Sequence, residues 1–205
     1  DSKVPFMVGF NRRYDKSVQK LKNSIKKGAI GIPQIIRITS RDPAPPDIHY
    51  LKTSGGLFLD MAIHDFDMAC FLNYNSVESV YSTGSVFGEK QIKNLGDIDT
   101  AVTTLNFENG SIATIDNSRK AAYGYDQRVE VFGDLGMCAI NNQTPDNHFI
   151  ADENGIHTPK PIGFFLERYA DSYRTIIKEF ISCLAEKKET PNGINAGLNS
   201  LKISL

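Results

Sequence analysis

Several features that would assign a function quickly are scarce in this chain. The three cysteines, Cys70, Cys138 and Cys183, lie far apart without CxxC spacing, which argues against a disulfide framework and favours a reducing, cytoplasmic compartment. Lys and Arg total 23 against 24 Asp and Glu, and this near-balance without a basic stripe argues against nucleic acid as a partner. The sequence shows no signal peptide and no apolar run long enough to cross a bilayer, so we expect no membrane partner.

Two signatures of cofactor sites are also missing. There is no GxGxxG and no other glycine loop that could cradle a phosphate, so these residues do not hold a dinucleotide alone. The adjacent His64 and Asp65 could offer nitrogen and oxygen ligands to a metal, as in HD-type phosphohydrolases. Such a site needs further histidines at metal spacing, whereas His148 and His157 lie far downstream in loop-like sequence. We therefore expect no metal.

The patterns that are present predict one α+β domain. The chain has 205 residues, of which 40% are hydrophobic, enough for a sizeable core. Apolar periodicity predicts helices at residues 14–31, 55–72 and 164–188 and from 194 onward. Strands are predicted at residues 4–10, 33–42, 77–87, 98–107, 111–120, 127–133 and 136–142. Because short turns join most of these strands, we expect an open, mostly antiparallel sheet covered on one face by helices.

The stretch GGLFLDMAIHDFDMACFL, residues 55–72, sets ionisable residues into an apolar run. On a regular helix Asp60, His64 and Asp67 share one face within about 40°, whereas Asp65 falls off that line. The helix is apolar almost all round and is expected to be buried. Since burying unpaired charges is costly, the polar line must face a partner, a metal or a wet cavity.

Two interpretations of this polar line compete. A core histidine tethered by a carboxylate one turn away would account for Asp60 and His64 alone. Asp67 on the same face favours function, because three ionisable groups are more than a tether needs. A carboxylate-oriented imidazole suits a general base near neutral pH, and the carboxylates can accept hydrogen bonds from the hydroxyl groups of a neutral substrate.

Two further stretches remain open to two interpretations each. The stretch GFNRRYD, residues 9–15, places adjacent arginines after a predicted buried strand, either at a ligand site or as solvated charges before a helix. The stretch RKAAYGYDQR, residues 119–128, places two tyrosines around a glycine. These tyrosines either pack in a plain turn or reach a polyol.

Taken together, these stretches resemble the substrate domain of the inositol dehydrogenases in the Gfo/Idh/MocA oxidoreductase family. The DxxxH spacing of Asp60 and His64 is general to that family. The narrower resemblance to the inositol dehydrogenases lies in HDFD, YGYDQRVEVFG and FFLERY. The similarity covers essentially the whole chain.

The resemblance implies a two-domain, NAD-dependent enzyme that oxidises myo-inositol or a similar cyclic polyol to the ketone. Residues 1–10 would be the last strand of an NAD-binding Rossmann domain, and residues 11–205 a substrate-binding and oligomerisation domain. The family's Glu-Lys-Pro motif does not occur here, which implies a catalytically incomplete fragment. The resemblance also implies a homodimer or homotetramer formed through the sheet.

The resemblance assigns roles residue by residue. His64 resembles the general base, and Asp60 its orienter and a substrate ligand. Tyr169 resembles a residue on the nicotinamide side of the cofactor. The polyol-contacting positions are Arg12, Asn11, Asp42, Asp67 and Tyr123, with Asn11 standing where some inositol dehydrogenases carry a larger apolar residue.

Two other functions remain as alternatives. The chain could belong to a non-catalytic regulator of the same fold that binds sugars or dinucleotides, although the presence of both Asp60 and His64 argues against it. It could also belong to an NAD-dependent glycosidase of the same superfamily, although YGYDQRVEVFG favours the inositol group.

Overall fold

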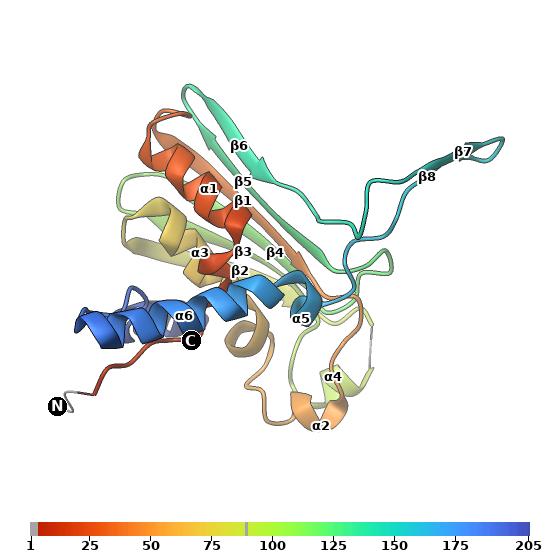
Figure 1. Cartoon of the computed structure of the whole chain (residues 1–205). Coiled ribbons are helices and arrows are strands. Elements are labelled where there is room, and N and C mark those ends of the chain that lie inside the picture. The colour runs from red at the N-terminus through yellow and green to blue at the C-terminus, as the bar shows by residue number, and fades with distance from the viewer. Residues whose placement is uncertain (1–3, 89) are drawn as a thin grey trace.

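The computed structural model describes residues 4–88 and 90–205 and shows an α+β fold built on a twisted six-stranded sheet (Figure 1). The strand order is β2 (Val77–Ser85), β3 (Thr100–Phe107), β4 (Ile112–Ser118), β1 (Pro33–Arg41), β5 (Asp126–Gly133) and β6 (Gly136–Ile140). Only β1 and β4 pair in parallel, and every other neighbouring pair is antiparallel. The predicted open, mostly antiparallel sheet is therefore confirmed.

The helices lie on one face of this sheet and below it (Figure 1). The helical elements are η1 (Asn11–Tyr14), α1 (Lys16–Lys26), α2 (Ile48–Leu51), η2 (Phe58–Ala62), α3 (Ile63–Asn73), α4 (Lys90–Asn94), α5 (Phe165–Arg168), α6 (Ala170–Glu186) and α7 (Ile194–Ser204). A separate hairpin of β7 (Ile150–Asp152) and β8 (Gly155–His157) projects away from the sheet. None of the helices in residues 4–88 and 90–205 has the length and apolar character needed to cross a membrane.

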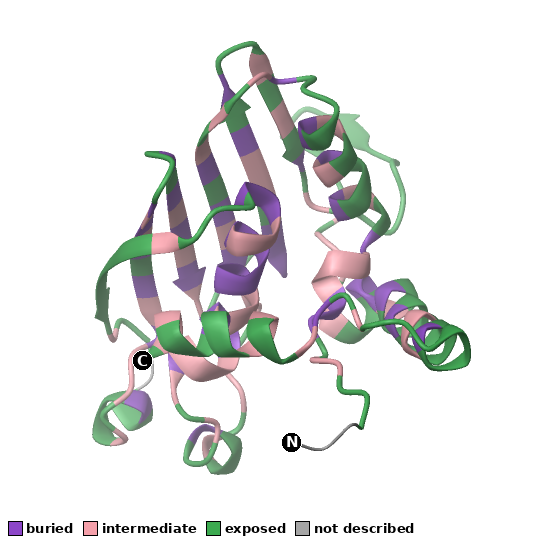
Figure 2. Ribbon diagram, turned by 90° about the vertical axis from the view of Figure 1, so that its left-hand side faces the viewer, coloured by how far each residue is buried: buried purple, intermediate pink, exposed green. Residues whose placement is uncertain are grey.

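The core lies between the sheet and helices α1 and α3. Alternation along β3 and β4 turns residues such as Leu105 and Ile115 inward, where both are fully buried. Val18 and Leu21 of α1 pack into the same core, as their helical spacing predicts. Figure 2 shows the resulting alternation of buried and exposed positions along the strands. The fold therefore buries one face of the sheet and leaves the other open.

The predicted strand at residues 4–10 is wrong. Residues 4–10 form no ladder and run past the turn at Asn192, whose backbone oxygen accepts from Val8 N at 2.8 Å. The side chains of Val4 and Phe6 are exposed. A strand needs a neighbouring edge to pair with, and the described residues offer none here. The assignment of residues 1–10 to the sheet of a Rossmann domain stays a prediction. Residues 1–3 lie outside the described part of the chain.

Two predicted helices are interrupted. The helix at residues 55–72 begins with the wide π-helical turn η2, and regular α-helical geometry starts only at Ile63. The helix at residues 164–188 breaks at Tyr169, whose backbone leaves the helical region at φ −114° and ψ 17°. Periodicity could not reveal either break, because the flanking residues keep a helical pattern. Both breaks lie beside the cavity described next.

Candidate active site

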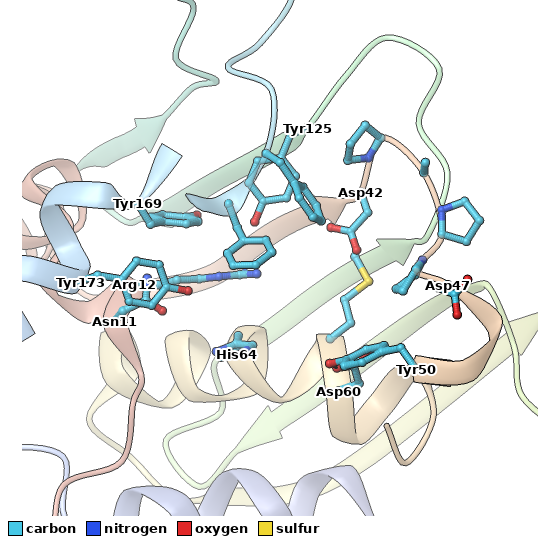
Figure 3. A pocket seen from close by; sticks show the side chains of 17 residues that line it. Asn11, Arg12, Asp42, Asp47, Tyr50, Asp60, His64, Tyr125, Tyr169 and Tyr173 are labelled. Atoms are coloured by element: carbon cyan, nitrogen blue, oxygen red, sulfur yellow. Dashed lines mark hydrogen bonds between the residues drawn. The ribbon is translucent and has the colours of Figure 1, made fainter. Parts of the chain in front are cut away.

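A cavity of about 650 Å³ lies between the segment η2–α3, the turn η1, the loop after β1 and the junction of α5 with α6. In Figure 3, Asp60 and His64 on the helical segment lie across the cavity from Asp42 and Tyr125. Six residues predicted from sequence line it: Asn11, Arg12, Asp42, Asp60, His64 and Tyr169. Its volume is in the range of small-molecule sites.

Asp60 is held by two partners from outside its own helix. One carboxylate oxygen accepts a hydrogen bond from the hydroxyl group of Tyr50 in α2. The other accepts from Nη1 of Arg119 at 3.0 Å. No hydrogen bond joins Asp60 to His64 in the described structure, so the orienting contact implied by the resemblance is not formed here.

His64 is positioned by packing. Its ring meets Phe10 edge to face, with 5.9 Å between ring centroids, and its buried Nδ1 has no hydrogen-bond partner among the described residues. Burial, and then the positive charge of Arg12, lower the pKa of His64 to about 3. The imidazole is therefore neutral at physiological pH, which is the form that can accept a proton.

Arg12 is fixed by Asp65, a residue that the helical-face argument set aside. Nη1 of Arg12 donates to Asp65 Oδ1 at 2.6 Å, and Asn117 Nδ2 donates to the other carboxylate oxygen at 2.8 Å. Asp65 is 1% exposed, and burial raises its pKa, although the charge of Arg12 opposes the shift. The signal that could have revealed this pair is the match between two adjacent arginines, Arg12 and Arg13, and the two acids of HDFD.

Asp67 does not line the cavity, contrary to its prediction as a polyol contact. Its carboxylate receives two hydrogen bonds from Arg13, at 2.8 and 2.6 Å, and is 2% exposed. Because the π-helical turn changes the angular spacing before α3, Asp67 no longer shares the face of Asp60. The Arg13–Asp67 pair instead attaches η1 to α3.

Asp42 lies at the cavity wall just beyond the end of β1. Burial raises its pKa to about 6, and the charges of Arg12 and Arg119 oppose this shift. Asp42 therefore titrates close to neutral pH. Its position agrees with its prediction as a polyol contact, although no ligand is present to test that role.

The structure exchanges the roles of the two tyrosines in YGYD. Tyr123 lies outside the cavity, where its hydroxyl group donates to Asp126 at 2.6 Å and accepts from Arg41 at 3.0 Å. Tyr125 lines the cavity, is 3% exposed and packs edge to face against Tyr169. Sequence spacing alone could not choose between them, because the turn at Gly124 decides which ring points inward.

Tyr169 and Asn11 complete the wall. Tyr169 is 6% exposed, and the guanidinium of Arg12 lies 5.6 Å from its ring centroid. Asn11 is 3% exposed, and its Nδ2 has no hydrogen-bond partner among the described residues. Within residues 4–88 and 90–205, no group of three or more His, Cys, Asp or Glu side chains is placed to hold a metal ion.

The fold and the cavity define a class, an α+β domain whose open sheet carries helices on one face and whose cavity has largely apolar walls with a few polar side chains. A family model described as the GFO/IDH/MocA C-terminal domain matches residues 18–139, and the chain belongs to this family. The architecture and the family implied by the sequence are thus confirmed.

Named relatives agree with this assignment. The chain is 49% identical to myo-inositol 2-dehydrogenase of Thermotoga maritima, over 87% of this chain and 53% of that protein. A crystal structure of a putative myo-inositol dehydrogenase from Sinorhizobium meliloti 1021 aligns with TM-score 0.94 at 42% identity, covering 97% of this chain and 60% of that one. Scyllo-inositol dehydrogenase from Lactobacillus casei, solved with NAD(H) and scyllo-inositol, aligns with TM-score 0.89 at 28% identity, over 98% and 61%. The chain thus spans between half and two thirds of the length of these relatives.

Proposed function

We propose that the whole protein oxidises myo-inositol or a similar cyclic polyol to the ketone, with NAD as hydride acceptor, and that this chain forms the substrate side of the active site. The observation that carries the proposal is the cavity itself, which gathers a neutral imidazole, Arg12 and the carboxylates of Asp42 and Asp60. The relatives' names support the substrate class.

His64 is the general base in this proposal. Its Nδ1 is buried, so Nε2 is the nitrogen that receives the proton of the reacting hydroxyl group while the hydrogen on the same carbon leaves as hydride. Burial and Arg12 disfavour a positive charge on the ring, so the base is unprotonated before the reaction, although the same two effects weaken it as a proton acceptor. The neutral imidazole therefore needs no proton loss to begin the cycle.

The remaining polar groups bind the other hydroxyl groups. Asp42 and Asp60 accept hydrogen bonds, whereas the guanidinium of Arg12 donates. Arg12 is already fixed by Asp65, which preorganises its donors. A neutral molecule with hydroxyl groups around a ring matches this mixture of acceptors and donors better than an anion does.

The cofactor would contribute only its nicotinamide end to this chain. NAD, when bound, supplies the hydride acceptor. The aromatic wall formed by Phe165, Tyr169 and Tyr173 suits a planar ring, with Tyr169 on the nicotinamide side. This chain has no glycine loop for the phosphates, so the dinucleotide would be held mainly by the part of the protein that the relatives have in addition.

We also propose how this chain divides between the two domains of the whole protein. Residues 1–10 belong to the nucleotide-binding domain and residues 11–205 to the substrate-binding domain. The apolar side chains of Ile177, Ile181 and Leu184 are exposed along α6 and would be covered by the nucleotide-binding domain. The open face of the sheet would pair with a second copy to form a dimer or tetramer.

An activity assay of the whole protein tests the proposal. NADH formation would be followed with myo-inositol, scyllo-inositol and an acyclic polyol such as sorbitol. We expect turnover with one or both inositols and little with sorbitol, because ion pairs fix the polar groups of the cavity wall in positions that suit hydroxyl groups held on a rigid ring. Failure to oxidise any cyclic polyol with NAD or NADP would overturn the proposal.

A further inference from the structure

Arg119 lies directly behind the cavity, and its buried charge requires an explanation. It follows β4, and its side chain is 1% exposed. Nη1 donates to Asp60 at 3.0 Å, while Nη2 lies 3.9 Å from Asp97 Oδ2. Nε and Nη2 have no hydrogen-bond partner among the described residues. Burying a guanidinium with so few partners is costly, which makes a plain stabilising role a poor explanation.

The partners of Arg119 flank the π-helical turn η2. Asp60 lies within this turn and faces the cavity. Asp97 Oδ1 accepts hydrogen bonds from the backbone nitrogens of Leu57 at 3.0 Å and Ile98 at 2.8 Å, so it fixes the residue that precedes the turn. Arg119 therefore lies between the start of the turn and the carboxylate that the turn presents.

We propose that Arg119 is a positioning residue whose guanidinium holds the Asp60 carboxylate in the orientation that receives a polyol hydroxyl group beside His64. The inference rests on the proposed function. Among the described residues, Arg119 is the one cation that forms an ion pair with Asp60. Arg12 instead forms an ion pair with Asp65 on the other side of the cavity. The hydrogen bond from Tyr50 fixes the second oxygen but supplies no charge.

The surrounding charges predict a pH signature. The ionisable groups around Asp60 are Tyr50 from α2, Asp42 after β1, Asp97 before β3, Arg119 after β4, His64 from α3 and Arg12 from η1. Arg119 lowers the pKa of Asp42, which burial raises to about 6. Removing Arg119 should raise the pKa of Asp42 further. Because the proposed function uses ionised Asp42, the rise of activity with pH should then occur at a higher pH.

Arg119→Met in the whole protein tests the proposal, with Asp97→Asn as the matched control. Both substitutions disturb the same buried cluster, but only the first removes the partner of Asp60. We expect Arg119→Met to lower kcat by about 10²-fold, the size typical of a misplaced reacting group, and to shift the acidic limb of the pH profile upward. Asp97→Asn should lower thermal stability and lower kcat far less than Arg119→Met does, because the hydrogen bond from Arg119 to Asp60 remains. Arg119→Lys, which keeps the charge, should recover part of the loss.

Two further measurements decide how Arg119 acts. In an Asp60→Asn background, Arg119→Met should cause no additional loss of kcat if it acts through Asp60. Equal kcat losses in Arg119→Met and Asp97→Asn, or full activity of Arg119→Met, would overturn the proposal. A crystal structure of Arg119→Met, or of Arg119→Lys if the first variant does not fold, reports on Asp60 without any assay. An unmoved Asp60 carboxylate overturns the positioning role, whereas an inactive parent enzyme overturns only the proposed function.

Discussion

The ionised form of Asp42 suits substrate binding in the proposed function but lowers the stability of the folded chain. In the proposed function its ionised carboxylate accepts a polyol hydroxyl group, but burial favours the protonated form and raises its pKa to about 6. Between its ordinary value of 3.8 and about 6, the folded chain therefore holds a proton that the unfolded chain has lost. Stability falls as pH rises through this window, and the whole penalty is present above it.

Asp42→Asn should therefore stabilise the protein at pH 8 by up to about 3 kcal/mol, because the amide carries no buried charge. At pH 4 the gain should nearly vanish, since Asp42 is then protonated in the folded chain and only partly ionised in the unfolded chain. Denaturant unfolding at both pH values measures the difference. Asp171→Asn, at an exposed carboxylate, is the control and should change stability little at either pH. An equal effect of Asp42→Asn at both pH values would contradict the assignment.

The residue pattern alone predicted site residues only where polar side chains interrupt an apolar run, and the other predicted residues came from the family resemblance. Asp60 and His64 were found because they are polar residues within an apolar helix, and the structure places both at the cavity. The prediction chose Asp67 and set Asp65 aside, whereas in the structure Asp65 is the residue that fixes Arg12 at the cavity. The error arose because the helical-face argument assumed a regular α-helix. Tyr123 and Tyr125 stand two residues apart at a turn, and nothing local decides which ring points inward.

At the scale of elements, Asp15 connects helix α1 to the junction of α5 with α6, which carries part of the cavity wall. Its carboxylate caps α1 by accepting from the backbone nitrogens of Ser17 at 2.9 Å and Val18 at 3.2 Å. The same side chain pairs with Arg168 at 2.6 Å, and both partners are nearly fully buried. Arg168 directly precedes Tyr169, so the cap of α1 also holds the break between α5 and α6.

Asp15→Ala should lower the free energy of unfolding by about 3–5 kcal/mol, because it removes a cap and leaves the charge of Arg168 buried without its partner. Asp171→Ala breaks an ion pair between two exposed side chains, Asp171 at 95% and Arg174 at 73% exposure. It should lower the free energy of unfolding by less than about 1 kcal/mol. Urea denaturation of both variants measures the contrast. Equal costs would show that the Asp15–Arg168 pair contributes no more than a surface pair.

Most elements could be predicted from the sequence, whereas their interruptions could not. Alternation predicted the strands of the main sheet, and helical spacing predicted α1, because burial on one face determines both patterns. The turn η2 and the break at Tyr169 follow from contacts distant in sequence, such as Asp60 with Arg119 and Arg168 with Asp15. Local patterns carry no information about such pairs.

At the scale of the molecule, the open face of the sheet carries an apolar row. Cross-strand register places Ile112, Ile35, Phe132 and Met137 next to one another across β4, β1, β5 and β6. Phe132 and Met137 are 42% and 51% exposed. A continuous apolar row of this kind favours association with a second copy.

Phe132→Glu should therefore weaken self-association, because a charge in the centre of the row would be buried on pairing. Sedimentation velocity over a range of concentrations measures the effect. Ile156→Glu, at an exposed apolar side chain of the separate hairpin, is the control and should leave the association unchanged. A parent protein that stays monomeric at high concentration would contradict the sheet interface.

The account as a whole depends on His64 as the base. The most direct test is the turnover number of His64→Ala in the whole protein with myo-inositol and NAD, together with the affinity for NAD. We predict a loss of kcat of about 10²–10⁴-fold with NAD affinity nearly unchanged, because the imidazole acts on the substrate proton. A variant whose turnover stays within about threefold of the parent, well inside the range that general-base catalysis contributes, would contradict the account and make His64 a structural residue.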